Sequence, residues 1–206
     1  MINEEIKDKR GIGYSLGNIG NFYADKGDYD NALDYQTRSL KIREGINHKQ
    51  GMGISFSDIG DVYNDKGDYD QAFDYYENSL QLFNKLDNPF GTGVTLCNIG
   101  NIYLNKGDYK NAEDYFEQAL INAKGIGLGA NHLIWSTTYL YLTYKNLCKA
   151  YDKDDILRLI KESEHIEFKL NYRLYELLEE TSYLETAYSQ VQEKADNLEP
   201  DVAAKF

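Results

Sequence analysis

One tetrapeptide recurs at a constant interval, and this recurrence restricts the fold more than any other feature of the chain. Lys-Gly-Asp-Tyr occupies residues 26–29, 66–69 and 106–109, so its copies lie 40 residues apart. Each copy follows an Ile-Gly-x-x-Tyr segment and precedes an alanine by a fixed distance. A period of this length predicts a stack of similar helical or mixed units, each of which buries its apolar face against the next.

The residues within one period predict an antiparallel pair of helices. Gly27 and its two counterparts can adopt the left-handed conformation that ends a first helix, and the aspartate that follows can cap a second. Along the first helix, Leu16, Ile19 and Tyr23 recur at spacings of three and four, which makes one apolar stripe. Small residues recur where the two helices should approach closely: Gly20, Ala32 and Ser39, then Gly60, Ala72 and Ser79, then Gly100, Ala112 and Ala119.

This pattern resembles the tetratricopeptide repeat, in the longer form similar to the Pins and LGN scaffolds and to kinesin light chains. The tryptophan of the repeat signature is replaced by Leu16, Phe56 or Leu96, and the closing proline is absent. The resemblance implies an all-α fold, a right-handed superhelix of stacked antiparallel helix hairpins. It also implies that an extended peptide binds in the groove lined by the first helix of each pair.

The period and the ends of the chain predict seven segments. A C-terminal helix over about 172–198 has apolar residues at heptad spacing, and two interpretations stay open: a cap on the last repeat, or a coiled-coil helix for dimerisation or signalling. The expected segments are 1–10 as the tail of a preceding repeat or an N-terminal extension, repeats at 11–49, 50–89 and 90–128, a degenerate fourth repeat at 129–170, the C-terminal helix at 171–199 and a tail at 200–206.

The first repeat is expected to lack a cap. Ile2 aligns with Ile42 of the next period, so Met1 to Lys9 correspond to the tail of a second helix whose own hairpin is missing. This leaves the face around Tyr14 and Leu16 without a neighbour. The chain is then a fragment of a longer array, or a partner or a second copy covers that face.

Composition argues against several classes of partner and of site. The net charge of -12 disfavours nucleic acid and anionic membranes, since binding a polyanion needs clustered Lys and Arg. We expect a cytoplasmic protein, because no segment reaches the roughly 18 apolar residues of a membrane span. Cys97 and Cys148 form no ligand pair, and both are expected to be buried free thiols. The three histidines, His48, His132 and His165, suggest no metal site.

No catalytic constellation emerges, and no cofactor is predicted. The Gly-x-Gly elements, such as the one at Gly11 and Gly13, recur with the period and follow no strand, so a role in starting helices is favoured over nucleotide binding. Paired carboxylates such as Asp154 and Asp155 suit a helix N-terminus better than acid catalysis.

The groove implied by the resemblance supplies the candidate binding residues. Asparagine offers both a donor and an acceptor to a peptide backbone, and the central aspartates would favour a basic side chain. The alternative is that these polar residues only solvate an empty groove. The candidates are Tyr14, Asn18, Asn21, Ile54, Asp58, Asp61, Val94, Asn98, Asn101 and Leu104.

The function predicted from the sequence is therefore a protein–protein interaction scaffold that is not an enzyme. Its partner would be a protein or peptide, basic or neutral and extended, and a homodimer through the C-terminal helix or the uncapped N-terminal face is left open. The alternative is a regulatory or sensory repeat segment of a larger signalling protein, of the nucleotide cyclase or sensor kinase type.

Overall fold

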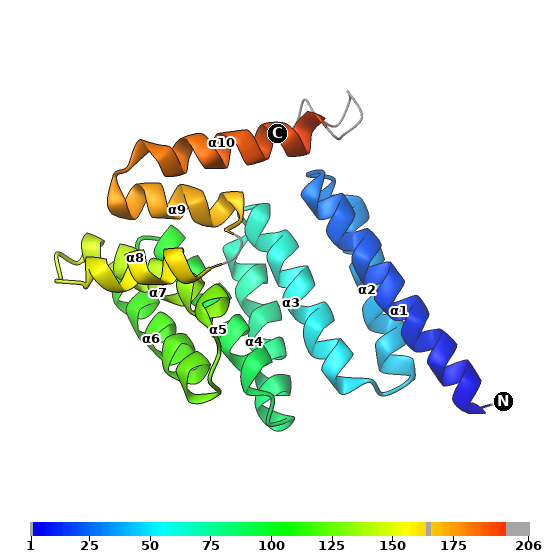
Figure 1. Ribbon diagram of the computed structural model, residues 1–206. Helices are drawn as coiled ribbons and strands as arrows, with labels where there is room; N and C mark the ends of the chain where they lie inside the picture. The colour runs from blue at the N-terminus through cyan, green and yellow to red at the C-terminus, as the bar shows by residue number, and fades with distance from the viewer. Residues whose placement is uncertain (1, 164–165, 197–206) are drawn as a thin grey trace. The chain divides into compact units, whose positions relative to one another are not determined.

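Ten α-helices make up the regular structure of the residues that the computed structural model describes, which are 2–163 and 166–196 (Figure 1). The predicted all-α class of stacked antiparallel helix hairpins is confirmed. The helices are α1 (Ile2–Asp25), α2 (Tyr29–Gly45), α3 (Lys49–Asp65), α4 (Tyr69–Lys85), α5 (Pro89–Asn105), α6 (Tyr109–Gly125), α7 (Ala130–Asn146), α8 (Lys153–Glu162), α9 (Phe168–Leu178) and α10 (Thr181–Asp196).

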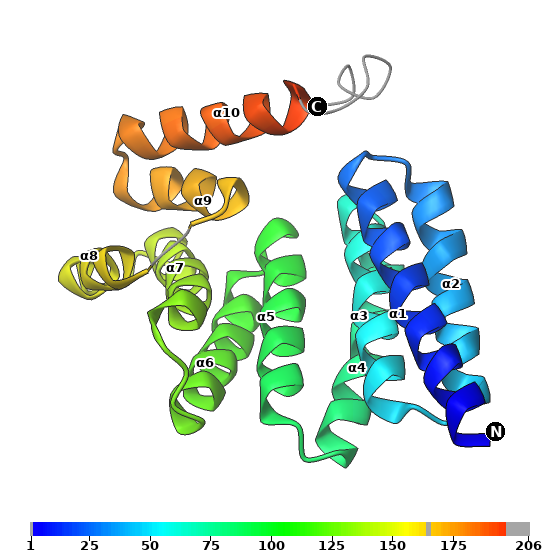
Figure 2. The same cartoon turned by 45° about the vertical axis from the view of Figure 1, so that its right-hand side comes forward.

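The chain divides into two compact units, Met1–Asn98 and Ile99–Phe206, so the division falls within α5. In the first unit α1 pairs with α2 and α3 with α4, and α2 also lies against α3 (Figure 2). In the second unit α7 contacts α6, α8 and α9, and α9 pairs with α10.

The turns of the three hairpins follow the predicted chemistry. Gly27, Gly67 and Gly107 have φ angles of 69°, 77° and 75°, in the left-handed region that favours glycine. The aspartate after each glycine caps the second helix, as where Asp28 Oδ1 accepts from the Asn31 backbone amide at 3.4 Å. The side chain of Asn31 forms a second hydrogen bond with this cap, since its Nδ2 donates to Asp28 Oδ2 at 2.8 Å.

Glycines on the first helices allow the close approach that the pattern predicted. A carbon added at Gly60 would lie 2.6 Å from the ring of Tyr76, and one added at Gly20 would lie 2.8 Å from Gln36. Tyr76 and Gln36 occupy equivalent places in the repeat and are both fully buried. Each hairpin therefore closes around one large side chain that the missing Cβ admits.

The N-terminal residues differ from one of the predictions. Residues 2–10 are continuous with the first helix of repeat one, because α1 runs from Ile2 to Asp25 without a break. They form a helical extension of that helix and not the tail of a separate second helix.

The C-terminal region also differs from the prediction of one long helix. The helix breaks at Glu179, whose φ of 62° is left-handed, and α9 and α10 on either side fold into a hairpin. Leu174 and Leu177 are buried on α9, whereas Tyr188 on α10 is exposed, so the heptad seam is divided between two helices. Leu198 and the predicted tail at 200–206 lie outside the described residues.

The fourth hairpin is shorter than predicted. Its second helix, α8, ends at Glu162 and not at Leu170, and Leu170 belongs to α9 instead. Asp152 caps α8 by accepting from the backbone amides of Asp154 and Asp155, so these two acidic residues occupy the first turn as expected.

Candidate peptide-binding face of the first helices

Three large apolar side chains stand exposed at one position of three successive first helices. Tyr14 on α1, Ile54 on α3 and Val94 on α5 are separated by the repeat period and all lie in the first unit. An exposed aliphatic or aromatic residue is common when single, but its recurrence at one repeat position makes a row. These three residues are the apolar part of the predicted binding face.

Asp61 is the hydrogen-bonding centre of this face. The hydroxyl of Tyr76 on α4 donates to its Oδ1 at 2.6 Å, and Nδ2 of Asn98 on α5 donates to the same oxygen at 3.1 Å. Burial and this carboxylate raise the pKa of Tyr76 well above its usual value, so the phenol stays a donor. Asp61 therefore joins two successive first helices, α3 and α5, and fixes their polar side chains in register.

Asp58 lies one helical turn before Asp61 and is half-buried. Burial and the charge of Asp61 raise its pKa, the guanidinium of Arg43 lowers it, and the net result is a pKa of about 7. At neutral pH this carboxyl is consequently divided between its neutral and charged forms. A cation placed beside it would favour the charged form.

Arg43, which the repeat pattern did not indicate as a site residue, is buried at the C-terminal end of α2. Its Nη1 donates to the carbonyl of Gly51 at 2.7 Å and to Ser55 Oγ at 2.8 Å, both on α3. Burial lowers the pKa of Arg43, and Asp58 raises it. The signal in the sequence was a cation at a repeat position that holds Phe83 and Ala123 in the other copies.

We expect the substitution Asp58→Asn to remove part of the pH dependence of stability. The folded-state pKa of Asp58 lies above its usual 3.8, so the folded chain binds more protons than the unfolded chain between about pH 4 and 7. This contribution is complete below about pH 4 and is lost as pH rises through 7. Since the side chain is only half-buried, we expect the free energy of unfolding of the unmodified chain to fall by about 1–2 kcal/mol relative to Asp58→Asn over that range.

Urea unfolding at pH values from about 4.5 to about 8 would measure this difference. Asp114→Asn, an exposed carboxylate on α6, is the matched control and should leave the pH profile parallel to that of the unmodified chain. Parallel profiles for Asp58→Asn as well would contradict the assignment.

The asparagines of the predicted face differ in their environments. Asn18 and Asn21 on α1 are exposed, and Asn21 Oδ1 accepts from Nε2 of the buried Gln36 at 2.6 Å. Asn101 belongs to the second unit, and its Oδ1 is buried with no hydrogen-bond partner among the residues that the structure describes. Asn18 is therefore the amide most available to a ligand within the first unit, and Asn98 is half-buried and already donates to Asp61 through Nδ2.

Leu104 is the one predicted apolar anchor that the structure contradicts. Its side chain is only 8 % exposed, whereas Val94 on the same helix is 44 % exposed. Leu104 falls where the other copies carry Ala24 and Asn64, so its bulk is used in the core of the second unit. It cannot serve as a contact for a peptide.

The cysteines and the other ligand-type side chains bring no chemistry to this face. Cys97 is half-buried but Cys148 is exposed, which corrects the expectation of two buried thiols. In the described part of the chain, no three His, Cys, Asp or Glu side chains are placed to hold a metal ion. His165 lies outside that part. None of the described helices is long and apolar enough to cross a membrane.

Comparison with protein families identifies the predicted repeat over most of the three hairpins. Two family models, both described as tetratricopeptide repeat, match residues 13–47 and 51–124. A comparison with curated protein sequences finds no match.

Solved structures share the fold at low sequence identity. BtubC (BKLC) from P. vanneervenii is 17 % identical with a TM-score of 0.60, covering 72 % of this chain and 60 % of its own length. The apo form of RapI is 16 % identical with a TM-score of 0.67, covering 91 % of this chain and 54 % of its own. A Rap protein complexed with competence and sporulation factor is also 16 % identical with a TM-score of 0.64, covering 98 % and 52 %. This chain thus spans 52–60 % of the length of these three relatives.

Proposed function

Because this chain belongs to the tetratricopeptide repeat family, whose domains generally mediate protein–protein interaction, we propose that it binds an extended peptide along α1, α3 and α5. The observation that carries the proposal is the row of exposed Tyr14, Ile54 and Val94, with the hydrogen-bonded Asp61 and Asn98 beside it. Non-catalytic binding is typical of the family, and the match is to repeat models and to no catalytic family.

The binding mechanism follows from the side chains of this face. Asn18 and Asn98 offer donors and acceptors to a peptide backbone, which makes their contacts tolerant of the peptide's sequence. Asp58 and Asp61 add negative charge between them, so a lysine or arginine of the peptide is favoured there. The apolar row would take aliphatic or aromatic side chains on either side of that residue.

A peptide ligand is supported by one of the structural neighbours. The Rap protein of similar fold was solved in complex with competence and sporulation factor, and this chain covers 52 % of its length. The longer neighbours also support the second candidate, a regulatory repeat segment within a larger signalling protein. The coding sequence on both sides of this chain separates the two, since an adjoining cyclase or kinase domain would favour the second.

We expect the double substitution Asn18→Ala and Asn98→Ala to weaken peptide binding by about tenfold or more. Each lost hydrogen bond is worth about 0.5–1.5 kcal/mol, and two act together. A display library of random linear peptides selected on the unmodified chain supplies the probe, and isothermal titration calorimetry with an enriched peptide gives its Kd.

Asn78→Ala, an exposed asparagine on α4, is the control for this experiment and should leave the Kd unchanged. Thermal unfolding should move little in Asn78→Ala, whose side chain is exposed, and the double variant should lose no more than the Asn98–Asp61 hydrogen bond, about 0.5–1.5 kcal/mol. If the double variant bound enriched peptides as tightly as the unmodified chain, the proposed face would be rejected.

A further inference from the structure

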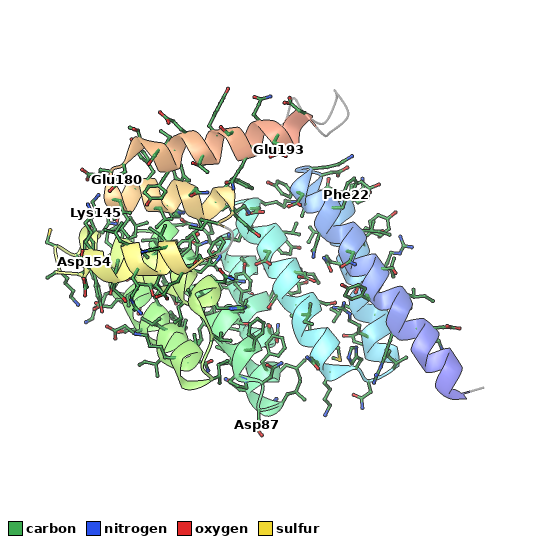
Figure 3. All side chains as sticks on the ribbon, in the orientation of Figure 1. Phe22, Asp87, Lys145, Asp154, Glu180 and Glu193 are labelled. Carbon is green, nitrogen blue, oxygen red and sulfur yellow. The ribbon has the colours of Figure 1, made fainter. Side chains whose placement is uncertain are left out.

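The outer face of α1 exposes residues that the same repeat positions bury one period later. Ile19 and Phe22 are 38 % and 51 % exposed, whereas Ile59 and Val62 on α3 are 2 % and 1 % exposed. Phe22 is labelled on α1 in Figure 3. Ser15 is exposed as well, but Ser55 is fully buried. The difference lies in what covers each helix and not in the residue types.

A helix covers this face in the second repeat. The Oγ atoms of Ser39 on α2 and Ser55 on α3 lie 3.4 Å apart, and Arg43 of α2 donates to the same Ser55 oxygen. The same face of α1 carries equivalent side chains, so it is suited to pack against another helix as α3 packs against α2. It borders the proposed peptide face, because Asn18 lies three residues after Ser15 and four residues before Phe22 on the same helix.

The exposed stripe on α1 is self-complementary. It consists of Asp8, Ile12, Ser15, Ile19 and Phe22 on α1 and of Lys26 directly after that helix. The intervals between them are four, three, four, three and four residues, an order that is the same from either end. If a second α1 ran antiparallel on the first, each apolar residue would meet an apolar or small one and each charge an opposite charge. The opposed pairs would be Asp8 with Lys26, Ile12 with Phe22, and Ser15 with Ile19.

We propose that two copies of this chain associate through α1, antiparallel and related by a two-fold axis. The interface is isologous, so each copy contributes the same stripe and the assembly closes as a dimer. A head-to-tail stack through α2 is disfavoured because α3 already lies against that helix. Lys26, whose Nζ lies 4.4 Å from the centre of the Phe22 ring, would meet Asp8 of the second copy at each end of the stripe.

Sedimentation equilibrium of the full chain over a wide concentration range tests this proposal. A small interface predicts a reversible monomer–dimer equilibrium with a Kd of about 1–100 µM. Phe22→Glu should raise that Kd at least about tenfold, since it buries a charge opposite an apolar residue. Ile121→Glu, at an isoleucine of α6 that is 70 % exposed, is the matched control and should leave the dimer unchanged.

A charge exchange tests the antiparallel pairing itself. Asp8→Lys alone and Lys26→Asp alone should each raise the dimer Kd about three- to tenfold, because each creates two like-charged pairs. The double variant should restore the original Kd. Circular dichroism of every variant confirms that the chain is still folded.

Four outcomes would overturn the proposal. They are a monomer at every concentration, a dimer that Phe22→Glu leaves intact, polymers whose mass keeps growing with concentration, and a charge exchange that fails to restore association. Peptide binding measured in the Phe22→Glu monomer separates the two proposals, because that variant keeps the exposed row of Tyr14, Ile54 and Val94.

Discussion

We expect Phe116→Ala to lower the free energy of unfolding by about 3–5 kcal/mol, because it removes a fully buried ring from the core of the second unit. Phe116 on α6 is fully buried, and its ring lies 5.5 Å from that of Tyr139 on α7, centre to centre. The absent Cβ of Gly100 also makes room for this ring, so truncation leaves a cavity that a glycine cannot fill. Urea unfolding followed by circular dichroism measures the loss.

Ile121→Ala is the control for that experiment, because Ile121 belongs to the same helix and is 70 % exposed. Its free energy of unfolding should stay within about 0.5 kcal/mol of the unmodified chain. A loss below about 1 kcal/mol for Phe116→Ala would mean that the α6–α7 contact does not form the core of the second unit.

Gly60→Val should destabilise the chain by about 3 kcal/mol. The first added carbon alone would lie 2.6 Å from Cε1 of Tyr76, and that ring cannot swing aside freely. It is fully buried, and its hydroxyl is bonded to Asp61. The variant must therefore separate α3 from α4 or break the hydrogen bond on the peptide face, so it should weaken peptide binding as well.

Gly11→Val provides the matched comparison on α1. Nothing lies within 4 Å of a carbon added there, and the helix propensity of valine is slightly better than that of glycine. Its stability should change by no more than about 0.5 kcal/mol. Equal losses for the two variants would point to helix propensity and against the close approach of α3 and α4 as the cause.

The local chemistry of the three hairpins was predictable because each of its elements recurs at the same interval. Gly27 and Asp28 are a turn signal with a known backbone geometry, and the structure confirms both the left-handed glycine and the capping aspartate. The small residue at Gly60 likewise indicated a close approach before its partner, Tyr76, was known.

The break at Glu179 was not predictable, since glutamate rarely takes a left-handed conformation and favours helices. Apolar spacing alone cannot tell one long helix from two that fold onto each other with the same stripe inside. Tertiary packing decides, as Leu174 and Leu177 are buried on α9 and Ala187 is buried on α10. Leu104 was misassigned for the same reason, because burial depends on neighbours that a single helix pattern does not contain.

The candidate binding face was predictable in outline but not in its charges. The repeat position identified Asp58, whereas its raised pKa depends on burial and on Asp61 and Arg43. Arg43 comes from a different helix and had no place in the groove pattern. Electrostatic coupling between helices is set by distances in the folded chain, which the spacing of residues along one helix does not supply.

Because the left-handed glycines recur at a constant interval, one whole repeat can be removed and the two remaining ends still match in register, which a single globular core does not allow. Removal of residues 51–90 would join Gln50 directly to Gly91, a glycine in the place of Gly51. Thr95 would then offer its hydroxyl where Ser55 now meets α2. Genes for such arrays can therefore lengthen or shorten by whole periods, and the reach of the binding face can evolve without redesign of any junction.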